Sequence, residues 1–395
     1  MLKTLVELYD KEPLENVLSA CIFQPEMVVY ICDERDSSMR KETAVDRLFK
    51  SRGMACSARF YYINTADPRQ IMRAFEAVVR DYPGCVFDGS GGKDLVLLMA
   101  GQFCKERKVP MMYVDVDRRR FVDLGGCAGL AGQFCIPQFS AEDIFALAGA
   151  KLVGYGHFSP TEMNEAFEDD VLRIWPIVSK NPGAWGDAVG FFQAAASEME
   201  DQDLRLDAPA ALQVNRQTAA RANIPVLERL ESVGAIRDLS VKGERVRFTY
   251  ASLLMKKCLQ NQGIWLELYG YVTAKRSGLF HDVRTSLVVD WDNARGGERA
   301  TRNEIDILVI CGITPVFISC KMGTPTPLAL SEIKILSEKF GGGQTRTVVL
   351  TAADVHHDNR PLAQRAEDLD IDLLDRSDLA RGDLPSRLQR IALRQ

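Results

Sequence analysis

The sequence has 395 residues, of which 46% are hydrophobic and 26% are charged. This length is sufficient for two or three domains that each bury a core of their own. The formal net charge of −5 excludes a broadly basic protein that coats nucleic acid, although a nuclease needs basic groups only in its cleft.

The apolar segments are too short to predict a membrane protein. No run of about 18 apolar residues occurs, and residues 1–7 lack the apolar core of a signal peptide. We therefore expect a cytoplasmic protein without membrane contacts. The ten cysteines include no Cys-x-x-Cys pair and there are only four histidines, which argues against a zinc site and favours reduced, buried thiols.

In the first third of the chain, segments typical of strands alternate with segments typical of helices. We expect strands at residues 27–32, 58–63, 84–88 and 111–115, and helices at 16–23, 41–51, 68–80 and 95–106. This alternation predicts an α/β domain with a parallel, doubly wound sheet over residues 1–138. Ligands of such sheets bind beyond the carboxyl ends of the strands.

A glycine-rich loop, Asp88-Gly-Ser-Gly-Gly-Lys93, falls between a predicted strand and a predicted helix. Its glycines allow close approach of a ligand, while the helix start and Lys93 favour an anion. It is not a Walker A loop, because the lysine follows too soon and Asp94 stands where that motif has Ser or Thr. On these residues alone, a tight turn without a ligand is the better-supported interpretation.

The middle of the chain, residues 139–241, gives the weakest pattern. A predicted helix from Ile224 and two short strands indicate a small winged-helix-like unit. Such a unit can contact nucleic acid, here through Arg237, Lys242, Arg245 and Arg247. A connector with a solvated charged face is the commoner case, and we expect this segment to couple the two ends of the chain.

Residues 303–321 predict a β-hairpin, because two apolar β-branched runs flank a Gly-Ile-Thr-Pro turn. Side chains alternate along a strand, so Glu304 and Asp306 share a face of one arm, and Ser319 and Lys321 share a face of the other. Carboxylates at this position suit Mg²⁺ or Mn²⁺, and a lysine can orient the attacking water. An edge hairpin with a polar outer face gives the same short pattern.

The segments around this hairpin favour the catalytic interpretation. A predicted helix that carries Glu267 precedes it, and a helix from Leu330, a strand at 345–351, a second helix and a last strand follow. Residues 242–395 therefore resemble the PD-(D/E)XK nuclease superfamily, with Asp306 and Lys321 matching its metal-binding aspartate and its lysine. Ser319 replaces the glutamate of the Glu-x-Lys motif. Glu267, Glu304 and Glu332 are the candidates for the missing carboxylate, with Glu267 and Glu304 ranked first.

The two ends of the chain together resemble the effector nucleases of type III CRISPR systems that fuse a CARF domain to a PD-(D/E)XK domain. The resemblance implies a homodimer that binds a cyclic oligoadenylate, most often the tetra-adenylate, and then cuts DNA or RNA with a divalent metal ion. It implies that the glycine-rich loop and the loop at 33–38 contact this ligand. The residues expected there are Ser90, Gly91, Gly92, Lys93, Arg35, Ser37 and Ser38, whereas acidic residues 33, 34 and 36 would repel phosphates.

We therefore predict an allosteric endonuclease whose metal is held by Asp306 with Glu267 or Glu304. The alternative is a ligand-responsive regulatory or nucleic-acid-binding protein that has lost catalysis together with the motif's glutamate. A third possibility is an enzyme that uses the glycine-rich loop to turn over a nucleotide.

Overall fold

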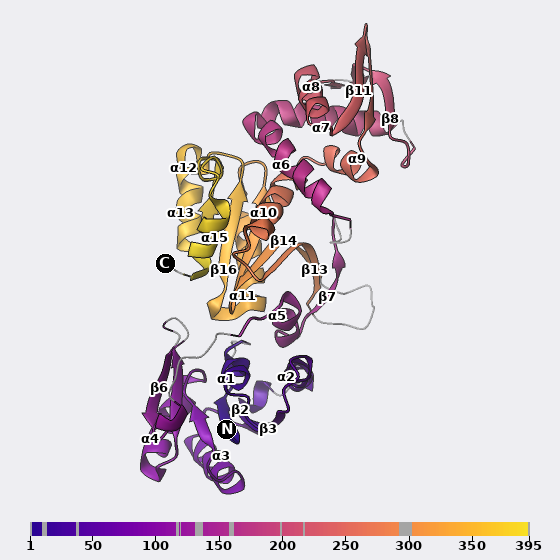
Figure 1. The fold of residues 1–395 in the computed structure, drawn as a ribbon. Helices are drawn as coiled ribbons and strands as arrows, with labels where there is room; N and C mark the ends of the chain where they lie inside the picture. The colour runs from indigo at the N-terminus through magenta and orange to yellow at the C-terminus, as the bar shows by residue number, and fades with distance from the viewer. Residues whose placement is uncertain are drawn as a thin grey trace.

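The structure is a computed structural model (Figure 1). It describes residues 2–9, 14–36, 39–115, 118, 120–130, 137–157, 162–197, 200–215, 218–291 and 302–393. Within these ranges, none of the helices combines the length and the apolar character that a membrane span requires.

The N-terminal domain is built on a six-stranded sheet with the order β3-β2-β1-β4-β5-β6, in which only β6 runs antiparallel to its neighbour. Its strands are β1 (Thr4–Leu8), β2 (Met27–Asp33), β3 (Ser57–Ile63), β4 (Val86–Asp88), β5 (Met111–Asp115) and β6 (Arg120–Gly125). Its helices are α1 (Glu15–Phe23), α2 (Met39–Ser51), α3 (Pro68–Asp81) and α4 (Asp94–Arg107). The predicted doubly wound α/β fold is confirmed.

The helices of this domain cover both faces of its sheet, as in Figure 1. Val17 of α1 and Val45 of α2 belong to one buried cluster, whereas Phe75 of α3 and Phe103 of α4 belong to another. The sequence analysis found every helix but missed two strands, β6 and the central β1. Strand β1 was missed because it is short and carries the acidic Glu7.

The C-terminal domain contains a second six-stranded sheet, with the order β17-β16-β15-β14-β13-β7. Its strands are β7 (Lys151–Tyr155), β13 (Asp282–Asp290), β14 (Arg302–Cys311), β15 (Thr314–Lys321), β16 (Arg346–Thr351) and β17 (Asp372–Leu374). The predicted hairpin is confirmed as the antiparallel pair β14 and β15, which turns at Gly312 with a positive φ of 66°. Strand β13, which precedes the hairpin, was not predicted.

Helices pack on both faces of this second sheet. Helices α10 (Ile264–Ser277) and α15 (Leu384–Leu393) contribute to the buried cluster on one face, and α5 (Ala141–Leu147), α11 (Pro327–Gly341) and α13 (Arg360–Asp368) to the cluster on the other. Two short helices, α12 (Val355–Asp358) and α14 (Arg376–Leu379), flank β17. The expected order of helix, hairpin, helix, strand, helix and strand is present, with β13 added.

A small unit is inserted into the C-terminal domain between β7 and α10. It contains a three-stranded sheet with the order β11-β12-β8 and a two-stranded hairpin. Its elements are α6 (Glu165–Lys180), α7 (Pro182–Ala196), β8 (Arg205–Pro209), β9 (Ala211–Gln213), β10 (Ala219–Arg221), α8 (Ile224–Ser232), β11 (Ile236–Lys242), β12 (Arg245–Tyr250) and α9 (Leu253–Leu259).

The expected boundaries of the middle segment are wrong at both ends. Strand β7 lies within residues 139–241 but pairs with β13 of the C-terminal sheet, and the boundary at 242 divides the β11–β12 hairpin. Within this segment only α5, at its start, lies between the two main domains, because the inserted unit lies beyond the C-terminal domain, away from the N-terminal one (Figure 1). Local patterns found the unit but not its position, which depends on how distant strands pair.

The N-terminal and C-terminal domains instead contact each other directly through α5. Arg52, which follows α2, donates to Asp143 of α5 at 3.0 Å and lies 4.4 Å from the centre of the Phe139 ring. On its other side, α5 is held by β13, where Asp282 accepts a hydrogen bond from the Ala141 amide at 2.8 Å. One buried cluster thus continues from the first domain into the second.

Candidate active site and ligand-binding loop

The hairpin brings Asp306, Ser319 and Lys321 together, as the sequence predicted. Asp306 Oδ2 accepts hydrogen bonds from the Cys320 amide at 2.6 Å and from Ser319 Oγ at 3.2 Å. Lys321 Nζ lies 3.7 Å from the same oxygen. These three contacts all use Oδ2, and together they fix the position of the carboxylate.

Glu267 of α10 lies beneath this group and is 6% exposed. Its Oε1 accepts hydrogen bonds from Thr285 Oγ1 and Ser286 Oγ, both at 2.6 Å. The pKa of Glu267 is raised to about 8, mainly by burial and in addition by the nearby charges of Asp306 and Glu304, although the hydrogen bonds from the two hydroxyl groups act to lower it. A cation bound here would offset the repulsion that the charges of Asp306 and Glu304 exert on Glu267.

Ser286 has a backbone conformation that is unusual for a strand residue. Its φ is 52°, in the left-handed region that side chains rarely adopt, and the residue is fully buried. The Gly156 amide donates a hydrogen bond to the Ser286 carbonyl at 2.7 Å, and the Ser286 hydroxyl is held by Glu267. Such strain persists where the surroundings hold it in place, often at functional sites.

Glu304 lies at the edge of the site, against the residues that follow β7. The exposed fraction of its side chain is 33%, and His157 Nε2 is 4.0 Å from its Oε1. A Cβ atom at position 156 would collide with the Glu304 carboxylate, so a side chain there would displace this carboxylate from its position. The remaining candidate, Glu332, is exposed on α11.

The donor set fits a hard divalent cation, since Asp306, Glu267 and Glu304 all offer carboxylate oxygens. Within the residues described, these oxygens do not all lie within 4.8 Å of one another; the group that does so is His356, Asp375 and Asp378. That second group already has internal hydrogen bonds, because Asp375 caps α14 and Asp378 binds Arg387. Thr285, Ser286 and Gly156 were not predicted from the sequence. For Thr285 and Ser286, the available signal was two adjacent hydroxyl residues in an apolar strand.

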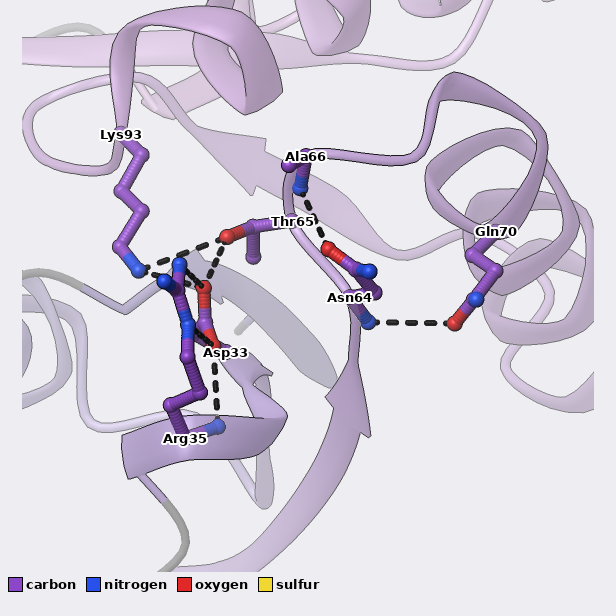
Figure 2. Close-up of polar contacts among 7 residues, drawn as sticks. All are labelled: Asp33, Arg35, Asn64, Thr65, Ala66, Gln70 and Lys93. Carbon is purple, nitrogen blue, oxygen red and sulfur yellow. Dashed lines mark hydrogen bonds and ion pairs between the residues drawn. The ribbon is translucent and has the colours of Figure 1, made fainter.

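The second candidate site lies at the carboxyl ends of β2 and β3 in the N-terminal domain (Figure 2). Asp33 is 1% exposed and binds the Arg35 guanidinium through both carboxylate oxygens, at 3.0 and 2.9 Å. Lys93 Nζ lies 2.6 Å from Asp33 Oδ2, and the Thr65 hydroxyl donates to the same oxygen. The hydrogen bond from Arg35, followed by those from Lys93 and Thr65, holds the pKa of Asp33 well below its usual range.

This arrangement changes the expected role of Asp33. The sequence analysis treated it as repulsive toward phosphates, but one buried carboxylate here orients two cations, which leaves the group with a net positive charge. Thr65 was not predicted, because only the pairing of β2 with β3 places it beside Asp33.

The glycine-rich loop connects β4 to α4 and positions Lys93 at the N-terminus of that helix. Gly92 has a φ of 116°, and a Cβ atom there would lie 2.7 Å from Leu8 Cβ, so the loop requires glycine at this position. Gly91 is half-buried in the same loop. Ser90 uses its hydroxyl within the protein, donating to Asp88 and accepting from the Val114 amide at 2.8 Å.

Arg35, Ser37 and Ser38 are the remaining residues that were predicted to contact the ligand. Arg35 is described, and its side chain is 75% exposed although it is bound to Asp33. Ser37 and Ser38 lie outside the described residues. Contact of Arg35, Ser37, Ser38, Ser90, Gly91, Gly92 and Lys93 with a ligand stays a prediction.

Comparison with solved structures gives two matches over nearly the whole chain. The crystal structure of protein VC1899 from Vibrio cholerae is 18% identical and covers 98% of this chain and 97% of its own, with a TM-score of 0.74. The structure of Can2 from Sulfobacillus thermosulfidooxidans in complex with cyclic tetra-adenylate is 16% identical and covers 99% and 98%, with a TM-score of 0.68. The chain has the fold of these two proteins.

At these identities the similarity shows the fold alone. No protein-family model and no curated protein matches the sequence. Because the similarity extends over both sheets and the inserted unit, it confirms the architecture that the resemblance to CARF-domain effector nucleases implied.

Proposed function

We propose that this protein is a metal-dependent endonuclease that cyclic oligoadenylate activates, with cyclic tetra-adenylate as the activator. The observation that carries the proposal is that Asp306 and Lys321 of the C-terminal sheet lie close to each other and to Glu267 of helix α10. The same chain holds Lys93 and Arg35 on a buried aspartate in an N-terminal domain of Rossmann type. Can2, which shares this fold, was solved with cyclic tetra-adenylate.

At the catalytic end, Mg²⁺ or Mn²⁺ bound by Asp306, Glu267 and Glu304 would supply an activated water and neutralise charge on the phosphate. The Cys320 amide, which donates to Asp306 Oδ2, would hold this carboxylate in place as a metal ligand. Thr285 and Ser286 orient Glu267. Lys321, whose Nζ lies 3.7 Å from Asp306 Oδ2, would polarise the attacking water or stabilise the negative charge that develops on the phosphate.

At the sensor end, Lys93, Arg35 and the start of α4 would bind the phosphates of the activator. Two copies of the loop, related by the two-fold axis of a homodimer, match the symmetry of a cyclic tetranucleotide. Binding changes activity only if it favours one of two arrangements of the domains. Helix α2 follows the loop of Arg35 and contacts α5, so it is the element through which we expect the change to pass.

The decisive experiment is a cleavage assay with labelled single-stranded and double-stranded DNA and RNA. Each substrate is incubated with Mn²⁺ or Mg²⁺, with and without cyclic tetra-adenylate. We expect fragments only when both metal and activator are present. Activator binding without any cleavage would instead support the regulatory alternative, for which Ser319 in place of a motif glutamate is the favouring observation.

Glu267 predicts how the stability of the metal-free protein depends on pH. Its pKa is raised from 4.5 to about 8, so between these values the folded state holds a proton that the unfolded state lacks. Stability must therefore fall as pH rises through this window. We compare the melting temperatures of the wild type and Glu267→Gln in the presence of a chelator. Between about pH 5 and about pH 9, the melting temperature of the wild type should fall by several degrees relative to that of the variant.

Added Mg²⁺ should reverse this loss for the wild type at high pH and have little effect on Glu267→Gln, because the cation stabilises the ionised carboxylate. Thermal melts monitored by circular dichroism measure both effects. Parallel melting curves for the two proteins across the whole pH range would contradict the raised pKa.

Arg52→Ala is expected to weaken the coupling between activator and cleavage. The substitution removes the ion pair with Asp143 and the contact with Phe139 that join the two domains. We expect the ratio of cleavage rates with and without saturating activator to be about 5-fold smaller in this variant than in the wild type, which is a typical size for coupling between two sites. Arg80→Ala, which breaks an exposed ion pair on α3, is the matched control. Equal activation of both variants would exclude this contact from the coupling.

A further inference from the structure

The three-stranded sheet of the inserted unit has an unusual charge for this chain. Its strands β8, β11 and β12 contain five lysines and arginines against two acidic residues, although the whole chain carries a net charge of −5. The unit is not positioned to connect the other two domains, so that role does not account for its charge (Figure 1).

The two faces of this sheet differ sharply. Along β8 and β12, Leu206, Ala208, Val246 and Phe248 are buried, and Phe192 of α7 packs with its ring centre 6.1 Å from that of Phe248. The alternate residues of both strands point to the opposite side. That opposite side, the basic face, carries the exposed cations Arg205, Arg237, Lys242, Arg245 and Arg247.

The strand register places these cations beside one another. Arg245 lies directly across from Lys242, and Thr249 lies between Arg237 on one side and Arg205 on the other. Arg245 and Lys242 are like charges at directly opposite positions, an arrangement that disfavours strand pairing. An anionic partner would relieve this repulsion.

Among the residues of the basic face that pair across the strands, one, Asp207, is a carboxylate. It accepts hydrogen bonds from Arg245 at 2.8 Å and from Arg247 at 2.7 Å, and these arginines, Arg245 first, lower its pKa. Asp238 lies at the β-bulge and Glu244 at the turn of the hairpin, where neither faces a partner across the strands. The five cations of the basic face thus share one carboxylate among the paired positions, and this carboxylate binds two of them.

We infer that the basic face binds the phosphate backbone of a nucleic acid. Alternate residues on a strand are about 7 Å apart and opposite residues about 5 Å apart, so the face presents a regular array of charges to a regular polyanion. Among the described residues of this face that pair across the strands, none is an aromatic residue on which a base could stack. The contacts would therefore be independent of sequence and sensitive to salt.

This inference deepens the proposed function, on which it rests for the identity of the substrate. The face would hold the nucleic acid on the inserted unit while the C-terminal sheet cuts it. By contrast, the exposed residues of α8, the helix expected to enter a groove in a winged-helix protein, include Glu228 and Glu231 and a single cation, Arg229. The open sheet, not this helix, has the complementary charge.

The test uses the full-length protein with Asp306→Asn, so that binding is measured without cleavage. Fluorescence anisotropy with labelled single-stranded DNA and RNA is recorded with Mg²⁺ and cyclic tetra-adenylate over a range of salt concentrations. Arg237→Gln, Lys242→Gln and Arg247→Gln are combined, which leaves Asp207 paired with Arg245. We expect at least about 10-fold weaker binding at low salt and a salt slope smaller by about 2 units.

The matched control combines Arg73→Gln, Lys105→Gln and Lys108→Gln, three exposed cations of the N-terminal domain. It should bind as the parent does. Unchanged affinity and salt slope in the basic-face variant would overturn the inference, and so would an equal loss in the control. Because binding is read separately from cleavage, failure of the proposed catalytic site would leave this result intact.

A second substitution protects the test against misfolding of the triple variant. Asp207→Asn removes only the single carboxylate of the basic face, and we expect nucleic-acid binding to tighten severalfold and the salt slope to steepen. Unchanged or weaker binding by a variant that melts at the parent's temperature would contradict the inference.

Discussion

Asp306→Asn is expected to reduce cleavage by about 100-fold or more while leaving the affinity for cyclic tetra-adenylate unchanged. Asparagine keeps the shape of the side chain and its hydrogen bond from the Cys320 amide, which is 2.6 Å in the wild type. It lacks the negative charge that a divalent cation requires, so the loss would report on metal binding and not on folding. Initial rates of cleavage and calorimetric titration of the activator measure the two effects.

Two variants define the limits of this prediction. Lys321→Ala should also abolish cleavage, since the substitution removes the ammonium group that lies 3.7 Å from Asp306 Oδ2. Glu332→Gln, on the exposed side of α11, should cut like the wild type. Full activity of both Asp306→Asn and Lys321→Ala would exclude the site.

Lys93→Ala is expected to weaken binding of cyclic tetra-adenylate by about 10-fold to 100-fold, the range for loss of a charged hydrogen bond. The substitution removes one of the two cations on Asp33 and leaves Arg35 to neutralise the carboxylate, so the positive charge of the loop is lost. Cleavage at saturating activator should remain near the wild-type rate, because the catalytic residues lie in the other domain.

Lys105→Ala is the matched control, because it removes an exposed lysine from the last turn of the same helix. It should bind the activator as the wild type does. Calorimetric titration of both variants decides the matter. Equal affinity of Lys93→Ala and Lys105→Ala would remove Lys93 from the ligand site.

Much of the candidate catalytic site was accessible from the sequence because a hairpin is a local structure. The turn before Thr314 fixes how β14 and β15 pair, and side-chain alternation then places Asp306 near Ser319 and Lys321. The helix of Glu267 was also predicted. Its contacts with Thr285 and Ser286 were not, since they required β13, which was missed.

The ligand-binding loop shows the same division. The glycines and Lys93 mark the loop between a strand and a helix, because both glycine conformations and helix starts have local signals. The grouping of Asp33, Thr65 and Lys93 depends on three segments separated by about 30 residues each, whose ends meet only through the strand order of the sheet. The sequence therefore presented Asp33 as a repulsive charge, and the structure shows it as the anchor of two cations.

By itself, the sequence determined the alternation of helices and strands in the N-terminal domain, the β14–β15 hairpin and the residue types at both candidate sites. These follow from side-chain periodicity and turn chemistry, which act over a few residues. Only the tertiary structure decided that β7 joins the C-terminal sheet, that the middle unit is an insertion and that the two main domains meet at α5. Strand pairing and burial between distant segments decide these features, and no local pattern records them.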